Sequence, residues 1–290
     1  MWNLLSYIRL HKSTIIVMPS STASPLLQFR EASIRFGGLT AVAPLSFDLP
    51  SGQMAAIIGP NGAGKTTVFN LITGVYAPTE GEIWFNENRI ASPGKSLRPH
   101  RLNELGIART FQNIRLFADL SVEDNVRCAC TAQAGYSLID TFLHTGKYFS
   151  AEKNIHREAS DLLDIFGLLK LRHTLARNLA YGDQRKLEIV RALATRPKLL
   201  LLDEPSSGMN PSETRDVTQI ILQIREQFNL TVLLIEHHMS VVMGICERVM
   251  VLDGGVKIAD DVPEAVQNDK HVIAAYLGEP DAKLETMLNG

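Results

Sequence analysis

The stretch GPNGAGKTT, residues 59–67, crowds small residues into a turn that ends in one lysine and two threonines. Small residues let the backbone curl until successive N–H groups point inward, which is an arrangement that binds anions. The spacing matches the pattern G-x-x-x-x-G-K-[ST], in which the lysine reaches the terminal phosphates and the next hydroxyl holds Mg²⁺. The residues expected to contact the phosphates are Gly59, Pro60, Asn61, Gly62, Ala63, Gly64, Lys65, Thr66 and Thr67.

Two elements flank this loop in the order that the pattern requires. MAAIIG, residues 54–59, is typical of a buried strand entering the loop, and TTVFNLITG, residues 66–74, of a helix that leaves it and ends at Gly74. The helix adds free N-terminal amides and the positive end of its dipole. An ordinary glycine-rich turn is the alternative, but it does not account for strand, loop and helix in this order. We therefore expect the loop to bind a nucleoside triphosphate.

Two carboxylates end a second apolar run, LLLLDEP at residues 199–205. Acids at the end of a buried strand mark the carboxyl edge of a sheet, where open α/β sheets bind their ligands. Asp203 is placed to hold Mg²⁺, and Glu204 to orient or deprotonate a water that attacks the γ-phosphate. The alternative for both acids is a helix cap.

A histidine ends the next apolar run, TVLLIEHH at residues 231–238. A single histidine is more often structural than catalytic. His237 nevertheless follows a P-loop and an acidic strand end in the chain, so we expect it to contact the γ-phosphate.

The composition sets outer bounds on the class of protein. Of the 290 residues 45% are hydrophobic and 21% are charged, with a formal net charge of −2, which suits a folded core but not a general nucleic-acid binder. Three cysteines suit a reducing compartment, and Cys128 and Cys130 stand too close for a C-x-x-C metal site, so we expect them to pack. No apolar run approaches the roughly 20 residues that span a bilayer.

The order of predicted elements indicates an α/β core with two additions. Residues 26–52 and 81–90 read as short strands joined by turns, which predicts an antiparallel β subdomain. From about residue 102 to 178 the pattern is helical, with Ser121 as an N-cap. Alternating strands and helices return after Leu179. The predicted fold is an α/β P-loop NTPase core with an antiparallel β subdomain and an inserted helical subdomain.

The two ends of the chain differ from this core. Residues 1–25 contain a Ser/Thr/Pro run and lack the charge order of a secretory signal, so we expect a disordered N-terminal extension. We also expect Met18 to be the true start, which the intact mass of the native protein tests. The folded domain is expected over residues 26–280, followed by a tail at 281–290.

Five stretches together resemble the nucleotide-binding subunits of ABC transporters, over about Leu26 to Gly278. They are GPNGAGKTT, TFQNIRLF, LAYGDQRKLEIVRAL, LLLLDEPSSGMNP and LLIEHH, in this order. The resemblance implies ATP and Mg²⁺ as ligands, with Phe36 stacked on the adenine and Gln112 linking Mg²⁺ to a membrane partner. It also implies a head-to-tail sandwich with a second ATP-binding subunit, a copy of this chain or a close paralogue. In it, one chain's signature contacts the nucleotide on the other's P-loop, through residues Ala180, Tyr181, Gly182 and Asp183.

The chain departs from the commonest form of these motifs. In the signature Leu-Ser-Gly-Gly-Gln, Ala180 replaces the serine, Tyr181 a glycine and Asp183 the glutamine. The missing serine removes a hydroxyl donor to the γ-phosphate, a bond worth about 1.5–3 kcal/mol with a charged group, while the helix amides remain. Asn210 replaces an acid of the following loop. His238 also replaces an acid, and the sequence offers no physical account of that change.

The variant motifs are similar to those of ATP subunits in importers of branched-chain or other hydrophobic amino acids. LAYGDQR, RTFQNIRLF, GGLTAV and VIAAYLGE carry this likeness. It implies integral membrane permease subunits and, indirectly, a solute-binding protein as partners, and a place at the cytoplasmic face of the inner membrane. Urea or amide importers carry similar subunits. The ATP subunit of the lipopolysaccharide exporter is also near, although it usually lacks the Arg109 to Gln112 form.

Other classes of function remain as alternatives. A non-transport ABC ATPase acting on DNA or ribosomes would usually carry a coiled-coil insertion, tandem cassettes or basic surfaces. A nucleotide-dependent switch that hardly hydrolyses ATP conflicts with the intact Asp203-Glu204 pair. The favoured reaction is in-line attack of water with Glu204 as base, Lys65 and the Mg²⁺ held by Thr66, Gln112 and Asp203 balancing charge, and His237 on the phosphate.

A partner surface is expected near Gln112. The segment NIRLFADL, residues 113–120, has more apolar residues than a loop needs, so residues 112–119 are predicted to line a groove for a short helix of the membrane subunit. Alternatively, these side chains pack the helical subdomain.

Overall fold

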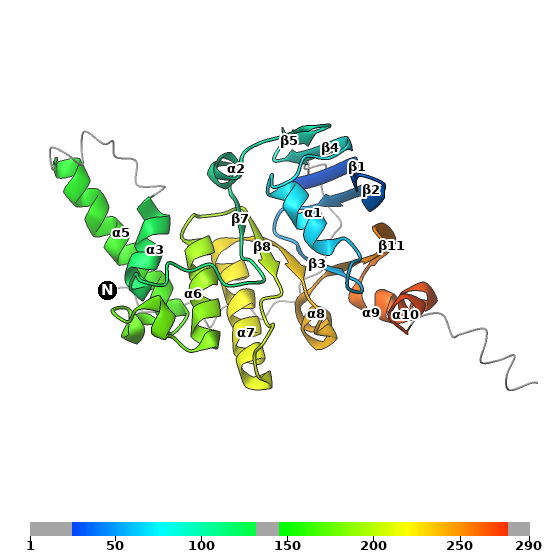
Figure 1. Ribbon diagram of the computed structural model, residues 1–290. Helices are drawn as coiled ribbons and strands as arrows, with labels where there is room; N and C mark the ends of the chain where they lie inside the picture. The colour runs from blue at the N-terminus through cyan, green and yellow to red at the C-terminus, as the bar shows by residue number, and fades with distance from the viewer. Residues whose placement is uncertain (1–24, 132–144, 278–290) are drawn as a thin grey trace, which may run out of the picture.

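The computed structural model of the protein describes residues 25–131 and 145–277. Apart from Pro25, the N-terminal extension expected at 1–25 lies outside the described residues, as does the tail expected at 281–290. Within the described ranges, no helix has both the length and the apolar character needed to cross a bilayer. The described chain forms two sheets and the helices packed on them (Figure 1).

The first sheet is antiparallel and has the strand order β2-β1-β4-β5-β6. Its strands are β1 (Leu27–Phe36), β2 (Leu39–Leu49), β4 (Glu80–Phe85), β5 (Asn88–Ser92) and β6 (Lys95–Ser96). The predicted turns between these strands are confirmed, and Gly37, Asn86 and Glu87 adopt the left-handed conformation that tight turns require. Gly81 packs so closely on the β1 backbone that a Cβ there would lie 2.1 Å from the Glu31 oxygen.

The second sheet has the order β11-β10-β3-β9-β8-β7, in which β7, β8, β9, β3 and β10 are parallel and β11 pairs antiparallel with β10. Its strands are β3 (Met54–Ile58), β7 (Ile107–Arg109), β8 (Leu199–Asp203), β9 (Thr231–Ile235), β10 (Arg248–Asp253) and β11 (Val256–Asp261). Every residue of β3, β8 and β9 is buried. Both faces of these strands are covered, which explains their continuous apolar runs.

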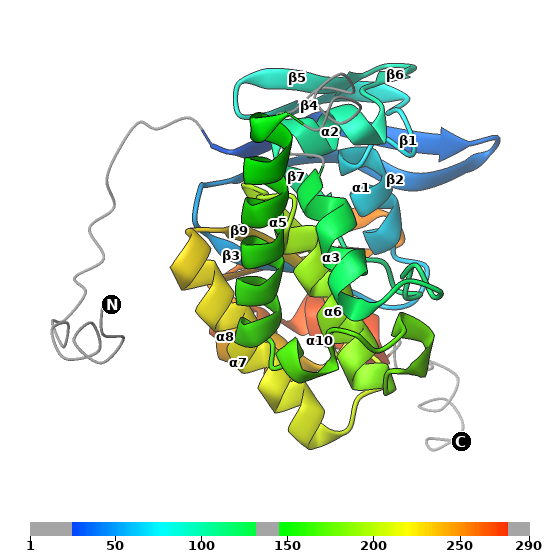
Figure 2. The ribbon, with the colours of Figure 1, turned by 90° about the vertical axis from the view of Figure 1, so that its left-hand side faces the viewer.

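Two hydrophobic clusters lie on opposite faces of the parallel sheet. One joins that sheet to α1 (Lys65–Ile72), α2 (Pro99–Leu105) and the antiparallel sheet. The other joins it to α6 (Tyr181–Leu193), α7 (Pro211–Phe228), α8 (Met239–Ile245), α9 (Pro263–Gln267) and α10 (Lys270–Leu277). The parallel sheet is therefore the middle layer of the molecule. Figure 2 shows the antiparallel sheet above it.

The helical segment extends from the second cluster. It contains α3 (Val122–Thr131) and α5 (Gly146–Ile165), which pack on α6, and the 3₁₀ turns η1 (Leu169–Leu171) and η2 (Ala176–Asn178). The predicted N-cap is confirmed, because Ser121 Oγ accepts from Asp124 N at 3.0 Å. Strand β7 lies inside the range 102–178 that the sequence indicated as helical. The prediction missed β7 because a strand of three residues is too short to show an alternation of apolar and polar residues. Its partner strand β8 is also about 90 residues away in sequence.

Candidate nucleotide site

The loop after β3 is shaped by close backbone contacts. Gly59 has a φ of 144°, and a Cβ there would lie 2.0 Å from the carbonyl oxygen of Leu252 in β10. Gly64 has a φ of 97°, and its Cβ would lie 2.6 Å from the oxygen of Ala41 in β2. Glycine is therefore required at both positions of the pattern, because neighbouring strands press on the loop from two sides.

Lys65 is the first residue of α1 and only 6% exposed. Its Nζ donates to the carbonyl oxygens of Gly59 at 2.7 Å and Pro60 at 2.8 Å, so it lies across the loop. Burial lowers the pKa of Lys65, and the charges of Glu204 and Asp203 oppose that shift. Asn61, Gly62 and Thr66 are exposed, which leaves the loop open to a ligand.

Asp203 ends β8 and forms a buried ion pair with Arg109 at the end of β7. Arg109 Nη2 lies 2.7 Å from Asp203 Oδ2, with the two side chains 5% and 3% exposed. Arg109 Nη1 also donates to Asn70 Oδ1 at 2.7 Å, which ties the acid to α1. Burial raises the pKa of Asp203, and the hydrogen bond and charge of Arg109 oppose the rise. Sequence reasoning missed this role of Arg109, although a charged residue next to an apolar run was a visible signal.

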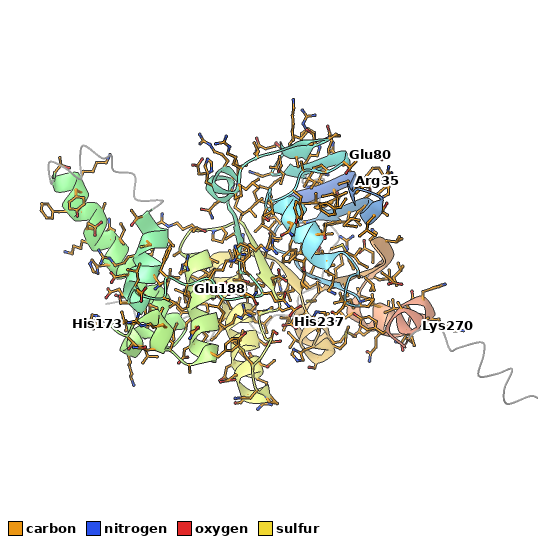
Figure 3. All side chains as sticks on the ribbon, in the orientation of Figure 1. Arg35, Glu80, His173, Glu188, His237 and Lys270 are labelled. Atoms are coloured by element: carbon orange, nitrogen blue, oxygen red, sulfur yellow. The ribbon has the colours of Figure 1, made fainter. Side chains whose placement is uncertain are left out.

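Glu204 holds together two of the expected catalytic residues. Its Oε2 accepts from Gln112 Nε2 at 3.1 Å, and its Oε1 lies 2.7 Å from His237 Nε2. Glu204 has a φ of 50°, an uncommon backbone conformation for a residue with a side chain. The carboxyl ends of β7, β8 and β9 thus bring Gln112, Glu204 and His237 to one point, and Figure 3 shows His237 near the middle of the molecule.

The buried carboxylate of Glu236, which sequence reasoning missed, holds the backbone next to His237 in place. Glu236 is 1% exposed and accepts hydrogen bonds from Ser206 N and Oγ and from the backbone N–H groups of His237 and His238. His238 Nδ1 also lies 2.8 Å from Ser206 Oγ. His238 therefore joins a network that already has its acid in Glu236, which gives the departure at 238 a physical account.

Phe36 ends β1 with 44% of its surface exposed. Its ring contacts Tyr76 edge-on, with the centroids 5.0 Å apart. The hairpin that carries Phe36 touches the P-loop through Ala41, as the close contact at Gly64 records. An exposed aromatic ring beside a phosphate-binding loop is suited to stack on a base.

The signature residues begin α6 and are not gathered with the P-loop. Among the described residues, their recorded contacts are with other parts of α6 and with the segment that precedes and begins α7. Tyr181 lies against Gly208 and near Arg185, Gly182 faces Glu213, and Asp183 is 3.9 Å from Lys186. Ala180 is the N-cap of α6 and supplies no side-chain cap. None of these recorded contacts joins a signature residue to the loop at residues 59–67.

Asn210 has a local structural role. Its side chain accepts from Ser212 N at 2.9 Å and Glu213 N at 3.0 Å, while Glu213 accepts from Asn210 N. This reciprocal capping box begins α7. An asparagine caps a helix as well as an aspartate does, so the departure at 210 costs the helix little.

The donor set suits a hard cation that is shared with phosphate. No cluster of three or more His, Cys, Asp or Glu side chains suited to a metal occurs in residues 25–131 and 145–277. The exposed Thr66, Gln112 and the buried Asp203 are oxygen donors of the kind Mg²⁺ takes, and Mg²⁺ is commonly held by one or two carboxylates together with substrate phosphates. The site fits Mg²⁺ bound with a nucleotide.

Comparisons with known proteins identify the family of the chain. Residues 42–207 match the family of ABC transporters, and residues 256–282 match a family described as branched-chain amino acid ATP-binding cassette transporter. A high-affinity branched-chain amino acid transport ATP-binding protein, LivG of Salmonella typhimurium, is 42% identical over 89% of this chain and 99% of its own length. The lipopolysaccharide export system ATP-binding protein LptB of Escherichia coli is 34% identical over 84% of this chain and 93% of its own.

A solved structure shares the architecture. The ADP conformation of MJ1267, an ATP-binding cassette of an ABC transporter, is 28% identical and aligns with a TM-score of 0.75 over 89% of this chain and all of its own. The predicted fold class is thereby confirmed, with the P-loop core, the antiparallel sheet and the added helices. From its motifs, its folded site and these relatives together, the chain belongs to the ATP-binding proteins of the ABC transporter family.

Proposed function

We propose that this chain is the ATP-hydrolysing subunit of an importer of branched-chain amino acids. The observation that carries the hydrolytic part is the position of Glu204, whose carboxylate lies between Gln112 and His237 at the carboxyl edge of the parallel sheet. The amino acid substrate is supported by the LivG relative and by the match of residues 256–282.

The P-loop residues bind and orient ATP. The loop N–H groups and the start of α1 face the phosphates, and Lys65 exchanges its bonds to Gly59 and Pro60 for bonds to phosphate oxygens. Phe36 stacks on the adenine. Mg²⁺, held by Thr66, Gln112 and Asp203, neutralises phosphate charge when it is bound. Arg109 keeps the Asp203 carboxylate in place.

Glu204 acts as the base. A water beside its carboxylate attacks the γ-phosphorus and the bond to the ADP oxygen breaks, while the water's proton passes to Glu204. The Gln112 amide fixes one oxygen of that carboxylate. The His237 ring beside the other oxygen swings to the γ-phosphate and stabilises its developing charge.

The signature residues act on a second nucleotide. Ala180 to Asp183 begin α6 and make their recorded contacts away from Lys65 in their own chain, which is the arrangement a head-to-tail dimer requires. The free amides at the start of α6 face the phosphates held by a second ATP-binding subunit. Two chains then enclose two ATP molecules.

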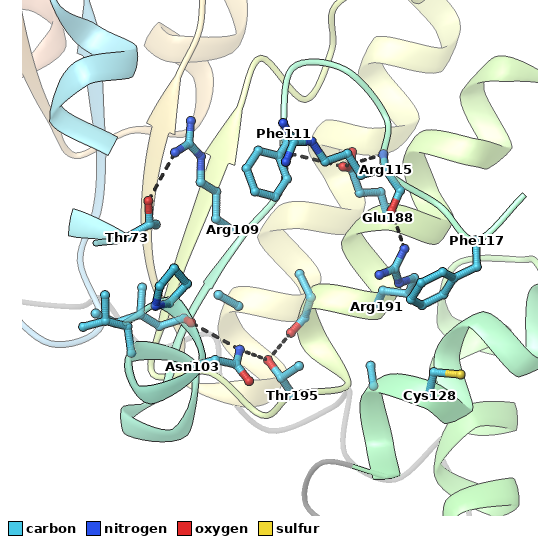
Figure 4. A pocket seen from close by; sticks show the side chains of 16 residues that line it. Thr73, Asn103, Arg109, Phe111, Arg115, Phe117, Cys128, Glu188, Arg191 and Thr195 are labelled. Atoms are coloured by element: carbon cyan, nitrogen blue, oxygen red, sulfur yellow. Dashed lines mark hydrogen bonds between the residues drawn. The ribbon is translucent and has the colours of Figure 1, made fainter. Parts of the chain in front are cut away.

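A groove beside the Gln112 segment supplies the surface for a membrane permease subunit. It has a volume of about 500 Å³ and lies between α2, β7, α3 and α6 (Figure 4). Its wall joins apolar side chains, such as Phe117, to the cations Arg115 and Arg191, whereas the lining residue Arg109 is already paired with Asp203. The acid in the lining, Glu188, is neutralised by Arg185. A short amphipathic helix with a carboxylate at its tip fits this surface.

The exposure of its residues supports this docking surface over internal packing. Phe117, which lines the groove, is 50% exposed, and Leu120, which lies outside the lining, is 36% exposed, whereas Leu116 packs on the helical core. In pull-downs with the permease subunits, Phe117→Ala is expected to lose the complex. The matched control is Phe149→Ala, an exposed phenylalanine on α5 that does not line the groove. The groove assignment fails if Phe117→Ala assembles normally. Docking there holds the chain at the cytoplasmic face of the membrane.

The hydrolytic dimer is tested with Glu204→Gln. We expect this variant to bind Mg-ATP, to lose steady-state hydrolysis, and to shift from monomer to dimer in size-exclusion chromatography when Mg-ATP is present. Glu226→Gln, an exposed change on α7, is the control and keeps the wild-type turnover. Hydrolysis that survives in Glu204→Gln would remove this residue from the role of base.

The substrate is tested by transport. Deleting the gene in its own host is expected to abolish high-affinity uptake of radiolabelled leucine, with wild-type chain restoring uptake and Glu204→Gln failing to do so. Loss of urea uptake with leucine uptake intact would point instead to the amide importers. A defect in lipopolysaccharide export with both uptakes intact would point to the exporter.

A further inference from the structure

Helix α6 holds the loop that carries Gln112 through two buried side chains. Arg185, which is 0% exposed, donates from Nη1 to the Phe111 oxygen at 2.6 Å and from Nη2 to the Gln112 oxygen at 2.7 Å. Glu188 Oε1 accepts from Phe111 N at 3.2 Å and from Arg115 N at 3.4 Å. We call residues 111–115 the Q-loop, and Arg185 with Glu188 the α6 clamp.

The α6 clamp is an unusual feature of a helix core. Arg185 lies on the buried side of α6 with Gly182, Ile189 and Ala192, where helical spacing otherwise places apolar residues. Its Nη1 is 3.0 Å from Glu188 Oε2, and burial raises the pKa of Glu188. An apolar pair of similar volume commonly stabilises a core as well or better, so packing alone does not explain this pair.

The α6 clamp fixes the same residue that bonds the catalytic acid. The backbone oxygen of Gln112 is held by Arg185, and the side chain of Gln112 donates to Glu204 at 3.1 Å. At the other end, Arg185 Nη2 lies 3.3 Å from the hydroxyl of Tyr181 in the signature. A continuous chain of contacts therefore runs from Tyr181 through Arg185 and Gln112 to Glu204.

Further contacts attach the Q-loop and the residues after it to α6. Arg191 Nη1 donates to the Arg115 oxygen at 2.5 Å, and the Arg191 guanidinium lies 4.6 Å from the Phe117 ring centre. Figure 4 shows Glu188 reaching toward Phe111 and Arg115 above Arg191. Since α6 holds the loop at Phe111, Gln112 and Arg115, a shift of α6 displaces the Gln112 side chain relative to Glu204.

We infer that Arg185 is a positioning residue that sets Gln112 against Glu204 within its own chain, and that it conveys the position of the signature end of α6 to that site. The second part rests on the proposed function, because it requires the signature to grip a nucleotide on a second chain. A nucleotide on the P-loop of the second chain contacts Tyr181 of the first chain and thereby affects hydrolysis by Glu204 of the first chain. The two ATP sites of the dimer are therefore coupled.

Hydrogen exchange tests the contact without any need for turnover. In Arg185→Met the Q-loop amides, including those of Phe111 and Arg115, are expected to exchange about tenfold faster, while the amides of α1 and β8 keep their protection. Arg157→Met, an exposed change on α5, is the control. Because Arg185→Met leaves Glu188 buried and unpaired, Arg185→Met/Glu188→Gln is measured in parallel. This second variant removes the buried charge but keeps an acceptor oxygen for the amides of Phe111 and Arg115, and it is expected to show the same increase. Unchanged Q-loop exchange in a folded variant overturns the inference.

Mixed dimers test whether Arg185 acts on its own chain. In the first dimer one chain carries Arg185→Met and the other Glu204→Gln, so the competent base belongs to the altered chain. In the second dimer one chain carries both changes, so the competent base belongs to a chain with Arg185 intact. The reference pairs a wild-type chain with a Glu204→Gln chain.

We expect the first dimer to lose roughly tenfold or more in kcat, a loss of the size that general-base positioning contributes, and the second to stay near the reference. Lysine reaches one carbonyl oxygen but not two, so Arg185→Lys is expected to restore part of the rate. A loss confined to the second dimer would make Arg185 a signature residue acting across the interface and would overturn the inference. If wild-type protein neither dimerises nor hydrolyses ATP, the proposed function fails. The hydrogen-exchange result then tests by itself whether Arg185 holds the Q-loop.

Discussion

The Nε2 atom of His237 lies 2.7 Å from the Oε1 atom of Glu204, across the carboxyl ends of two adjacent strands. This contact holds the Glu204 carboxylate, and under the proposed function the imidazole moves from it to the γ-phosphate. His237→Ala is expected to lower kcat about 10²- to 10³-fold, as loss of a transition-state donor does, with little change in the Kd for ATP.

The matched control for this change is His173→Ala, because His173 is exposed and lies in the helical segment, away from His237 (Figure 3). Steady-state kinetics and ATP binding by fluorescence separate the two variants. A His237→Ala protein that keeps the wild-type kcat would show that the contact with Glu204 is structural.

Ala180→Ser restores a side-chain cap and a hydroxyl donor at the start of α6. Ala180 is the N-cap, and its side chain accepts no bond, whereas serine at an N-cap adds about 0.5–2 kcal/mol of stability. We expect a higher Tm and dimerisation of Glu204→Gln at lower ATP concentration. Ala274→Ser, at an exposed position inside α10, is the control. A rise in Tm without tighter dimerisation would assign the serine to helix capping alone.

Arg109→Ala leaves the buried Asp203 carboxylate without its cation. Breaking a buried ion pair by removing one partner costs about 3–5 kcal/mol, so the free energy of unfolding in urea is expected to fall by that order. Arg109→Ala/Asp203→Asn removes the charge left behind and recovers part of the loss. Arg101→Ala, whose partner Glu104 is exposed, should change stability by less than about 1 kcal/mol. Equal effects of Arg109→Ala and Arg101→Ala would contradict this prediction.

The three cysteines are expected to differ in reactivity. Burial raises the pKa of Cys130 and of Cys246 to about 12, whereas Cys128 is exposed and lines the groove. Thiolate is the reactive form, so iodoacetamide at about pH 8 should label Cys128 in the native protein, and the other two only after unfolding or as the pH approaches about 12.

The same reagent probes the docking surface. Alkylated Cys128 carries extra volume into the groove, so labelled protein is expected to bind the permease subunits more weakly than labelled Cys128→Ser. Mass spectrometry locates the label, and a pull-down measures the complex. Normal assembly after complete labelling of Cys128 would place the partner elsewhere.

The sequence by itself determined the P-loop, the acidic strand end and the order of elements. These features are local, because a few neighbouring residues are enough to predict each of them. They are the glycines of residues 59–64, the apolar runs before Asp203 and His237, and the turns at 37–38 and 86–88. A family resemblance read from such short motifs was enough to anticipate the fold class.

Only the tertiary structure decided which side chains meet. Arg109 pairs with Asp203 across 94 positions, Gln112 with Glu204 across 92, and Arg185 reaches the Q-loop across 74 and 73. β7 was hidden for the same reason, since its pairing with β8 makes it a strand. Buried polar groups need hydrogen-bond partners, but the sequence offers several charged residues that could serve as the partner of each one. Packing of the sheet and α6 brings particular pairs within hydrogen-bonding distance, and no local pattern in the sequence encodes that choice.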